Sequence, residues 1–530
     1  MRAMTSTALP LPLERARRRV ANTTVHVAGV AGLFLAAGML ATACVGWGYD
    51  DPATGDLAIA GAVVGIVSLA MWRTTEPVAT LSRTSAFTAV GFAWIYAFFA
   101  AALPYVLAGT FDNFIHALFE AVSGLTTTGS TVLADIDAQG EGIKLYRQYT
   151  QWFGGGGIVL LALAILQGFG VGGLELAGAE IAGPSAERIA PRIATTARRL
   201  WTAYVLLTVA VAVALLAVGV GPYDAVAHAM STIPTAGFSV YNASIGQFDS
   251  AAVEAVLIIG MLAGGTNFAL QYRAYTRGPR RFVESPEFRT FISVFVVAVI
   301  GVTIINVGDG MSVLTSLRES AFNIATTLTT CGFGTSDFTT WLPSVQLLLL
   351  MFMIVGGMTG STSGGIKMLR FRVVLGHLWR DLRNARQPRG VFLVRLGKAA
   401  VAEDTVARIG AFVTLYLVTI LLGTTLLTIF GEDLITAFSG VVSDIGLVGP
   451  ALGEAGPHSN FLVYSDPSKV VLIVMMFLGR MELYVALLMF VTPIGAIRTN
   501  TRRLRRPRRT QRGALDRLGP PPHKNETRKT

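Results

Sequence analysis

Long apolar segments alternate with short polar loops along almost the whole chain. A helix needs roughly 20 apolar residues to cross the hydrocarbon core of a bilayer. Ten segments meet this requirement, and they predict an all-α polytopic membrane protein. The predicted spans are 24–45, 57–75, 86–108, 150–168, 200–220, 251–270, 288–307, 343–370, 405–430 and 469–493.

Four shorter apolar segments each precede a small-polar loop with a central glycine, and each lies between two predicted spans. The segments are 114–125, 222–233, 316–328 and 432–443, and the loops are Ser123–Gly129, Ser231–Phe238, Thr326–Phe333 and Ser443–Pro450. One such loop alone would be read as an ordinary turn. Four in register predict re-entrant loops that line a pore, because irregular backbone is tolerated in a membrane only where it is buried or wet.

The chain is therefore expected to contain four pseudo-symmetric helix–pore loop–helix repeats around one central pore. We predict an N-terminal tail with an added two-helix hairpin at 1–83, repeats at 84–185, 186–282, 283–395 and 396–497, and a basic disordered cytoplasmic tail at 498–530. The second helix of the third repeat is expected to be broken.

Composition supports the membrane assignment, since 52% of the residues are hydrophobic and 14% are charged. The net charge of +11 lies in clusters that alternate with acidic or neutral loops. These clusters are Arg15–Arg19, Arg73–Arg83, Arg188–Arg199, Arg273–Arg281, Lys367–Lys398 and Arg498–Arg512. By the positive-inside rule they predict cytoplasmic termini and contact with membrane lipid, rather than nucleic-acid binding.

The glycine loops suit a cation filter. Rings of backbone carbonyls replace the hydration shell of an ion without placing a full charge in its path. Glycine permits the necessary backbone conformation, and threonine hydroxyls add oxygen ligands. An acidic residue or amide is expected near the start of each pore helix, where it favours the helix N-terminus: Asp112 and Asn113, Asp224, Glu319, and Glu432 and Asp433.

The predicted span 343–370 is interrupted. The apolar run Val345–Val355 is too short to cross alone, and a glycine-, serine- and threonine-rich stretch, Gly356–Gly365, follows it. An interrupted span points to a working site in a transporter, although a frayed helix end is the alternative. Arg480 lies in another apolar stretch, where it needs a cavity or partners, and a structural ion pair is the alternative to a functional role.

Several longer motifs resemble the Trk/Ktr/HKT superfamily of potassium transporters, and most closely the bacterial Trk pore subunit. The resemblance covers roughly residues 25–497 and is carried by Phe119–Gly129, Gln151–Ile158, Phe248–Ser250, Glu287–Arg289, Gly356–Lys367, Leu452–His458 and Gly479–Glu482. It implies a bacterial cytoplasmic-membrane protein that forms a homodimer and is regulated by cytosolic RCK-type nucleotide-binding subunits. It also implies K⁺ as the transported ion.

The resemblance implies roles for individual residues. The filter glycines are Gly129, Gly237, Gly332 and Gly449, and the other filter candidates are Thr127, Thr128, Thr235, Ala236, Thr330, Cys331 and Val448. The gate candidates are Gly356, Gly357, Thr359, Gly360, Ser361, Thr362, Ser363, Gly364, Gly365, Lys367 and Arg480. Lys367 is either a cationic barrier at the inner end of the gate or a positive-inside anchor.

Two residues depart from the family pattern. Asp444 lies five positions before the fourth filter glycine, where bacterial relatives usually have a small or hydroxyl residue, and Pro234 lies in the second loop. Asp444 either faces the ion path and modifies selectivity or is hydrogen-bonded behind the filter.

No nucleophile–base arrangement and no metal-ligand spacing of histidines is present in the sequence, so an enzyme is not expected. The prediction is potassium uptake driven by the membrane potential. The alternatives are a K⁺/H⁺ or K⁺/Na⁺ symporter, which would use the carboxylates Glu120, Asp444 and Glu482, a less selective monovalent cation transporter, or a membrane scaffold or sensor with a vestigial pore.

Overall fold

The computed structural model describes residues 12–76, 83–169, 189–397, 399–483 and 486–487. Nearly all secondary structure in these residues is helical, which confirms the predicted class. The strands found there, β1 (Arg395–Leu396) and β2 (Ala399–Ala400), form one short antiparallel pair. The predicted tail at 498–530 and the end of the predicted span 469–493 lie outside the described residues.

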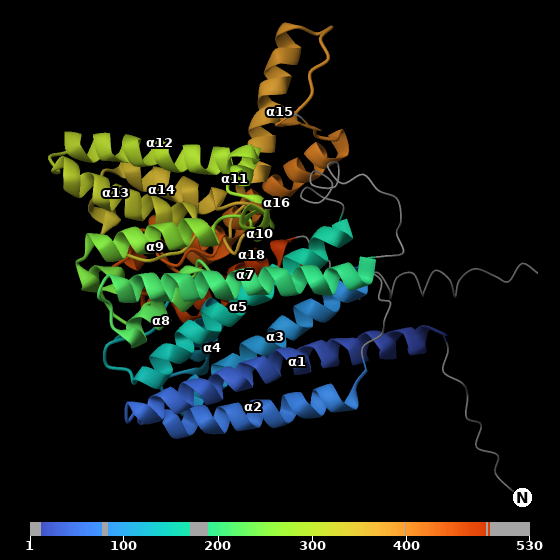
Figure 1. Cartoon of the computed structure of the whole chain (residues 1–530), viewed down its shortest axis with the longest axis vertical. Helices are drawn as coiled ribbons and strands as arrows, with labels where there is room; N and C mark the ends of the chain where they lie inside the picture. Colours follow the sequence, from blue (N-terminus) through green and yellow to red (C-terminus); the bar gives the residue numbers. More distant parts are fainter. Residues whose placement is uncertain (1–11, 77–82, 170–188, 398, 484–485, 488–530) are drawn as a thin grey trace, which may run out of the picture.

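An N-terminal hairpin precedes the repeats. It consists of α1 (Pro12–Gly48) and α2 (Thr54–Thr74), which pack along each other. α1 also contacts α3 (Arg83–Leu107) and α5 (Glu141–Phe169). The hairpin therefore lies at the edge of the molecule, beside the first repeat (Figure 1).

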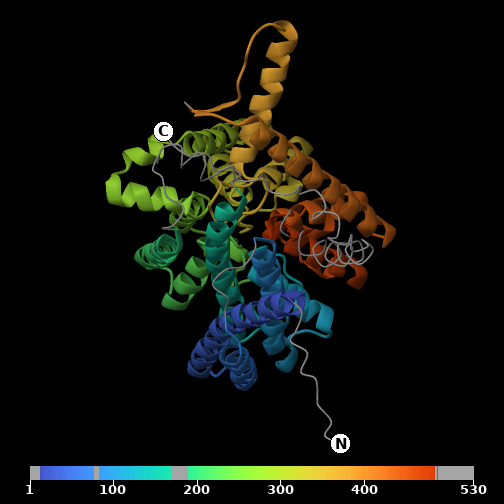
Figure 2. The same cartoon turned by 90° about the vertical axis from the view of Figure 1, so that its right-hand side faces the viewer.

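Each of the four repeats contains a first helix, a short pore helix and a second helix. Repeat 1 consists of α3, α4 (Phe114–Thr126) and α5; repeat 2 of α7 (Ile189–Ala217), α8 (Pro222–Thr232), α9 (Ala251–Gly264) and α10 (Phe268–Arg277). Repeat 3 consists of α12 (Pro286–Gly308), α13 (Val313–Leu328), α14 (Pro343–Val355) and α15 (Met368–Arg386); repeat 4 of α16 (Glu403–Ile429), α17 (Leu434–Gly446) and α18 (Asp466–Arg480). The short helix α11 (Arg280–Glu284) joins repeats 2 and 3. Figure 2 shows the repeats following one another in chain order around the middle of the molecule, and α15 projecting away from it.

Short 3₁₀ turns follow three of the pore helices, in the chain that leads to the second helix of the repeat. They are η2 (Ser244–Phe248), η3 (Phe338–Thr340), η4 (Gly453–Ala455) and η5 (Phe461–Val463).

Six described helices are long and apolar enough to cross a membrane on their own, and the bent pair α9–α10 would make a seventh. The pore helices α4 and α17 and the helix α14 are apolar but too short. α14 has only 13 residues, because the chain leaves the helix at Gly356, where φ is 72°. The predicted interruption of this span is therefore present in the fold.

The pore helices begin where a side chain or a proline favours a helix start. The side chains of Asn113 and Asp433 accept hydrogen bonds from backbone N–H groups in the first turns of α4 and α17. α8 starts with Pro222 and has Asp224 in its first turn. The expectation for the third pore helix was wrong, because Ser312, and not Glu319, caps α13. α13 starts earlier than the sequence suggested, and this leaves Glu319 inside the helix.

The second helix of repeat 2 was predicted as one continuous span at 251–270, and in the structure this segment is broken into two helices. The chain bends by 102° between α9 and α10. The break falls at Gly265 and Thr266, and the side chain of Asn267 then caps α10 by accepting from the backbone N–H of Leu270. A run of small and polar residues inside the apolar stretch was the sequence signal for this corner.

A buried ion pair ties the first pore helix to the second helix of its repeat. Arg147 on α5 donates through Nε to Glu120 on α4 at 2.8 Å, and their side chains are 1% and 0% exposed. Arg147 also donates to the carbonyl of Ser239 in repeat 2, at 3.0 Å. Glu120 accepts from the backbone N–H of Val132, beyond the filter loop, at 3.0 Å. One pair of opposite charges therefore connects two neighbouring repeats.

Replacing Arg147 should destabilise the fold strongly. In Arg147→Met the carboxylate of Glu120 stays buried without its cation, which costs about 3–5 kcal/mol. We expect a clear fall in the apparent melting temperature of the detergent-solubilised protein. The matched control is Arg281→Met, whose ion pair with Glu284 is about half exposed and is expected to contribute about 0–1 kcal/mol. Equal melting temperatures for the two variants would contradict this account.

Candidate functional site

The four filter loops share one backbone conformation. In each, the residue two positions before the glycine and the glycine itself have positive φ: Thr127 (59°) and Gly129 (87°), Thr235 (54°) and Gly237 (79°), Thr330 (57°) and Gly332 (90°), and Leu447 (59°) and Gly449 (108°). The left-handed region is unfavourable for residues other than glycine, so its use at the same position four times indicates a constraint set by the surroundings.

The same hydrogen bond ends each pore helix. The backbone N–H of the residue before the glycine donates to the carbonyl five positions earlier: Thr128 to Ser123 (2.9 Å), Ala236 to Ser231 (3.0 Å), Cys331 to Thr326 (2.8 Å) and Val448 to Ser443 (2.9 Å). This is the six-to-one bond of a Schellman-type helix end. It fixes the direction in which the chain leaves each pore helix.

The filter glycines close a ring. The Cα of each faces the carbonyl oxygen of the residue before the glycine in the next repeat, and a Cβ added to any of them would lie less than 3.0 Å from that oxygen. The facing pairs are Gly129 and Ala236, Gly237 and Cys331, Gly332 and Val448, and Gly449 and Thr128. The fourth pair returns to repeat 1. The filter candidates of all four repeats therefore meet at one place.

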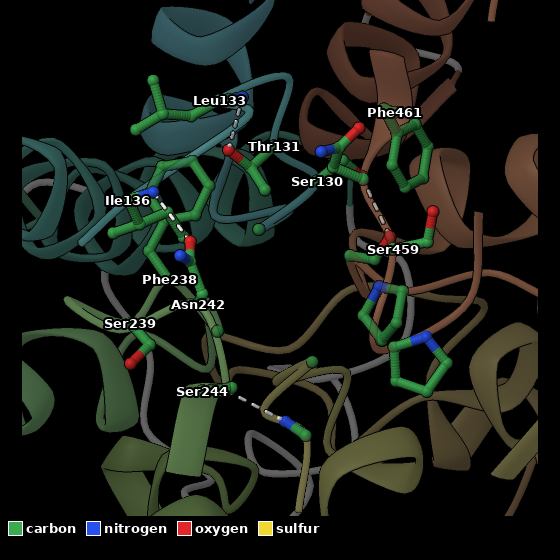
Figure 3. Close-up of a pocket in the computed structure, with 18 of the residues that line it drawn as sticks. Ser130, Thr131, Leu133, Ile136, Phe238, Ser239, Asn242, Ser244, Ser459 and Phe461 are labelled. Atoms are coloured by element: carbon green, nitrogen blue, oxygen red, sulfur yellow. Dashed lines mark hydrogen bonds between the residues drawn. The ribbon is translucent and has the colours of Figure 1, made fainter. Parts of the chain in front are cut away.

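A pocket opens on one side of this ring, and all four filter glycines contribute to its lining. Figure 3 shows Ser130 and Thr131 of repeat 1, Phe238 and Asn242 of repeat 2, and Ser459 of repeat 4 around the same opening. Near its rim, Asn242 accepts from the backbone N–H of Ile136 at 2.7 Å and donates to Asp135 at 2.8 Å. The hydrogen bond from Asn242 lowers the pKa of the exposed Asp135.

The loops are braced from behind in different ways. Hydroxyls of Thr326 and Ser443 accept from the N–H groups of Gly332 and Gly449, at 2.9 and 3.0 Å. In repeat 2, Gln151 of α5 takes this supporting role. Its Oε1 accepts from the Ser231 hydroxyl and the Phe238 N–H, and its Nε2 donates to the carbonyl of Ala236.

Gln151 is a site residue that the sequence analysis missed as an individual. The motif Gln151–Ile158 carries part of the family resemblance, but nothing in it indicates that the amide reaches the filter loop of the following repeat.

The two departures from the family pattern lie at different places. Pro234 follows the end of α8, and the next residue, Thr235, still adopts the left-handed conformation. Asp444 is fully buried on α17, and its Oδ1 lies 2.5 Å from Oγ of Ser130, the residue after the first filter glycine. It does not line the pocket above the ring.

On the side of the ring opposite the pocket lies the glycine-rich loop, residues 356–367, between α14 and α15. Its backbone is held by the corner between α9 and α10. The N–H groups of Met358 and Thr362 donate to the carbonyls of Gly265 (2.9 Å) and Gly264 (3.3 Å). Asn267 donates to the carbonyl of Thr359. The bend in repeat 2, which the sequence did not predict, therefore holds this loop in place by hydrogen bonds.

Glu287 holds the same loop from repeat 3. It lies at the start of α12 and accepts from the backbone N–H of Thr359 at 2.7 Å. The motif Glu287–Arg289 carries part of the family resemblance, but the sequence does not predict its contact with the loop.

The loop also lies directly against the filter loops of repeats 2, 3 and 4. Thr362 contacts the hydroxyl of Thr235 at 3.3 Å, and the N–H of Gly364 donates to the hydroxyl of Thr330 at 2.7 Å. A Cβ on Gly364 would collide with the carbonyl of Gly446 and contact Leu447. The contact with repeat 1 is made through Arg480.

Arg480 is 2% exposed and joins three elements. It donates to the hydroxyl of Thr127 (2.8 Å) and to the carbonyls of Gly154 (2.7 Å) and Thr362 (3.4 Å). No ion pair of Arg480 occurs among the described residues, where Glu482 instead pairs with Arg370 at 2.6 Å. Lys367 is 9% exposed, and its Nζ donates to the carbonyl of Ser363 inside the loop.

The remaining gate candidates complete this loop. Gly356, Gly360, Gly365 and Lys367 have positive φ, Gly357 accepts from the N–H of Met368, and Ser361 donates to the carbonyl of Met358. The structure therefore brings the filter candidates and the gate candidates together as two stacked layers.

Four membrane-embedded repeats, a closed ring of backbone carbonyls and irregular backbone beneath it define a pore-type membrane transport protein. The family model TrkH, described as "Cation transport protein", matches residues 58–498. The chain therefore belongs to the TrkH family, as its motifs predicted.

Individual relatives agree with this assignment. The Trk system potassium uptake protein TrkH of Salmonella typhimurium is 36% identical over 434 residues, which are 81% of this chain and 89% of that protein. The protein of the same name from Halomonas elongata is 38% identical over 71% of this chain and 78% of its own. The crystal structure of the potassium transporter TrkH from Vibrio parahaemolyticus superimposes with a TM-score of 0.81 at 32% identity, over 88% of this chain and 98% of that one. These relatives are transport proteins, which confirms that the chain is not an enzyme.

A side chain at a filter glycine should destroy discrimination between cations. In Gly332→Ser the new Cβ would overlap the carbonyl of Val448, and φ is 90°. Strain of about 1–3 kcal/mol must shift the ring, so we expect at least a roughly tenfold fall in the ratio of K⁺ to Na⁺ flux into proteoliposomes. The matched control is Gly310→Ser, where φ is 102° but nothing lies within 4 Å of an added Cβ. An unchanged flux ratio in Gly332→Ser would show that the ring does not select.

Proposed function

We propose that this protein takes up potassium through the pore defined by the ring of Gly129, Gly237, Gly332 and Gly449. The observation that carries the proposal is the closure of this ring by the carbonyl oxygens of Thr128, Ala236, Cys331 and Val448. Carbonyl oxygens bind a dehydrated monovalent cation without a fixed charge. Relatives that match most of the chain in sequence are named as potassium uptake proteins. The protein with a similar solved structure is described as a potassium transporter.

Electrostatics of the pore helices support a cation rather than an anion. α4, α8, α13 and α17 all end at the ring, so their carbonyl ends contribute partial negative charge there. The driving force is the membrane potential, which supplies about 2.3 kcal/mol per charge for every 100 mV.

The glycine-rich loop together with Arg480 is proposed as the gate. The loop contacts Thr235 and Thr330, and Arg480 contacts Thr127 and the loop itself. These contacts put polar backbone and one full positive charge in the exit path of a cation. Opening would require Thr362 and Gly364 to leave their partners on the filter loops.

The proposal includes an orientation in the bacterial cytoplasmic membrane. Arg73, Arg277 and Arg281 lie at one set of helix ends, and Asp50 and Asp135 lie in loops of the alternate set. The positive-inside rule assigns the basic set, both termini and the projecting helix α15 to the cytoplasm. Cytosolic RCK-type nucleotide-binding subunits and a homodimer remain part of the proposal, on the strength of the motifs that this chain shares with its family.

Coupled transport with H⁺ or Na⁺ is the alternative mechanism. Of the three carboxylates that it could use, Glu120 is paired with Arg147 and Glu482 with Arg370. A reversal potential that follows the K⁺ gradient alone would remove this alternative. A reversal potential that moves with pH or Na⁺ at fixed K⁺ would establish it.

The test of the proposed function is cation flux into proteoliposomes that contain the full chain. Potassium, rubidium, sodium and lithium are compared at neutral pH under an imposed inside-negative potential. Flux of K⁺ and Rb⁺ that exceeds the flux of Na⁺ and Li⁺ and follows the potential is the expected result. Sodium flux equal to that of potassium would reject a potassium-selective filter.

Removal of the charge beneath the filter should open the pore. Two unit charges about 4 Å apart interact with about 4 kcal/mol at an effective dielectric constant of 20. We therefore expect Arg480→Gln to raise basal K⁺ flux about tenfold or more. Arg372→Gln is the control, because Arg372 bonds to Pro286 and Thr290 rather than to the loop or the filter. A fall in the basal flux of Arg480→Gln would mean that the residue supports the pore instead of closing it.

A further inference from the structure

Asp444 and Ser130 are both exceptions within the fourfold pattern. Five positions before the filter glycine, the other three repeats have Gly124, Thr232 and Thr327. Directly after the filter glycine, where repeat 1 has Ser130, repeats 2, 3 and 4 have Phe238, Phe333 and Pro450. The two exceptional residues belong to repeats 4 and 1, which adjoin where the ring closes.

In the structure these two residues contact each other and the filter. Ser130 Oγ lies 2.5 Å from Asp444 Oδ1 and 3.1 Å from the carbonyl oxygen of Gly449. Threonines at the position of Asp444 in repeats 2 and 3 instead donate to their own helix, to the carbonyls of His228 and Asn323. Only at the junction of repeats 4 and 1, therefore, does this position of a pore helix reach a filter carbonyl through a neighbouring repeat.

The number of available protons determines which side chain donates in the contact between Asp444 and Ser130. A hydroxyl has one proton, so Ser130 cannot donate fully to both oxygens. If Asp444 were ionised, it would compete with Gly449 for that proton. If Asp444 carries a proton on Oδ1, it donates to Ser130, and Ser130 donates to Gly449. Asp444 Oδ1, Ser130 Oγ and the Gly449 carbonyl oxygen then all take part in a hydrogen bond.

Burial favours the protonated carboxyl. Asp444 is 0% exposed, its Oδ2 has no hydrogen-bond partner, and it takes part in no ion pair among the described residues. An isolated buried carboxylate is far more costly than a buried carboxylic acid.

The groups on the elements packed against α17 do not supply a counter-charge. The ionisable residues of these elements are Lys469 and Arg480 on α18, Tyr464 in the turn before α18, Tyr416 on α16 and Glu454 on η4. Lys469 and Arg480 are hydrogen-bonded to other residues, the phenols are neutral below about pH 10, and a further carboxylate only disfavours ionisation. α14 has no ionisable side chain.

We propose that Asp444 is an uncharged carboxylic acid that orients the Gly449 carbonyl through Ser130, and that this pair is a positioning element that sets the cation preference of the filter. The proposal rests on the proposed function and adds a determinant of selectivity to it. The pair fixes the direction of one carbonyl of the fourth filter loop at the junction with the first. A weakened hydrogen bond there would let this carbonyl turn away from its position.

The test compares variants of the full chain in proteoliposomes by the K⁺ to Na⁺ permeability ratio, obtained from reversal potentials under bi-ionic conditions. Asp444→Asn keeps an N–H donor without a charge, and we expect its ratio to stay within about twofold of the parent. Asp444→Ala and Ser130→Ala lose the donor chain, and we expect each to lower the ratio about fivefold, the equivalent of one hydrogen bond. The double variant should be no worse than either single variant, because both act through one chain.

Two further measurements separate positioning from mere structural support. The parent ratio should stay constant between pH 5.5 and 8, since the carboxyl keeps its proton throughout. Thr232→Ala is the matched control, because its hydroxyl bonds only within its own helix. Its ratio should equal that of the parent.

Several results would overturn the proposal. They are a ratio in Asp444→Asn as low as in Asp444→Ala, a parent ratio that follows pH, or an unchanged ratio in Ser130→Ala. Parent protein without K⁺-selective flux would instead reject the proposed function. A selective parent with equally selective variants would reject only the role of Asp444 and Ser130.

Discussion

One constraint governs the rest of the structure: four stretches of non-helical backbone must be held inside a membrane, where no water satisfies their polar groups. Each stretch has its N–H groups bound from behind, by the six-to-one bond at the end of the pore helix and, in repeats 3 and 4, by the hydroxyls of Thr326 and Ser443. What remains to face the centre is a set of carbonyl oxygens. Carbonyl oxygens are the groups that a dehydrated cation needs, and those of Ala236 and Gly449 also accept a hydrogen bond from Gln151 and Ser130.

The four repeats meet this constraint with different supports. In repeat 2 the filter loop is supported by Gln151. The boundary of repeats 1 and 2 is held by the ion pair of Glu120 and Arg147, and the boundary of repeats 4 and 1 is held by Ser130. The backbone of the carbonyl ring therefore repeats four times, whereas the side chains that support it differ between repeats. A single chain allows this, because each copy of the repeat can carry its own side chains.

The extent of sequence-based prediction follows from the range of the interactions. The pore helices and the interruption after Val355 were predictable, because hydrophobic length and glycine content are local properties. The cap at Ser312, the bend at Gly265 and the contact of Asp444 with Ser130 were not predicted. In the last case the partner lies 314 positions away in the chain, and no local pattern indicates which side chains meet across the boundary of two repeats.

Closure of the ring also limits how such a chain can diverge. Each filter glycine touches the carbonyl that precedes the glycine of the next repeat, from Gly129 through to the return from Gly449 to Thr128. A new side chain at this boundary in one repeat therefore meets residues of the next repeat, as Asp444 meets Ser130. A chimaera that exchanges a single repeat with a relative replaces one half of two such boundaries. The contacts that close the ring therefore belong to pairs of neighbouring repeats rather than to single repeats.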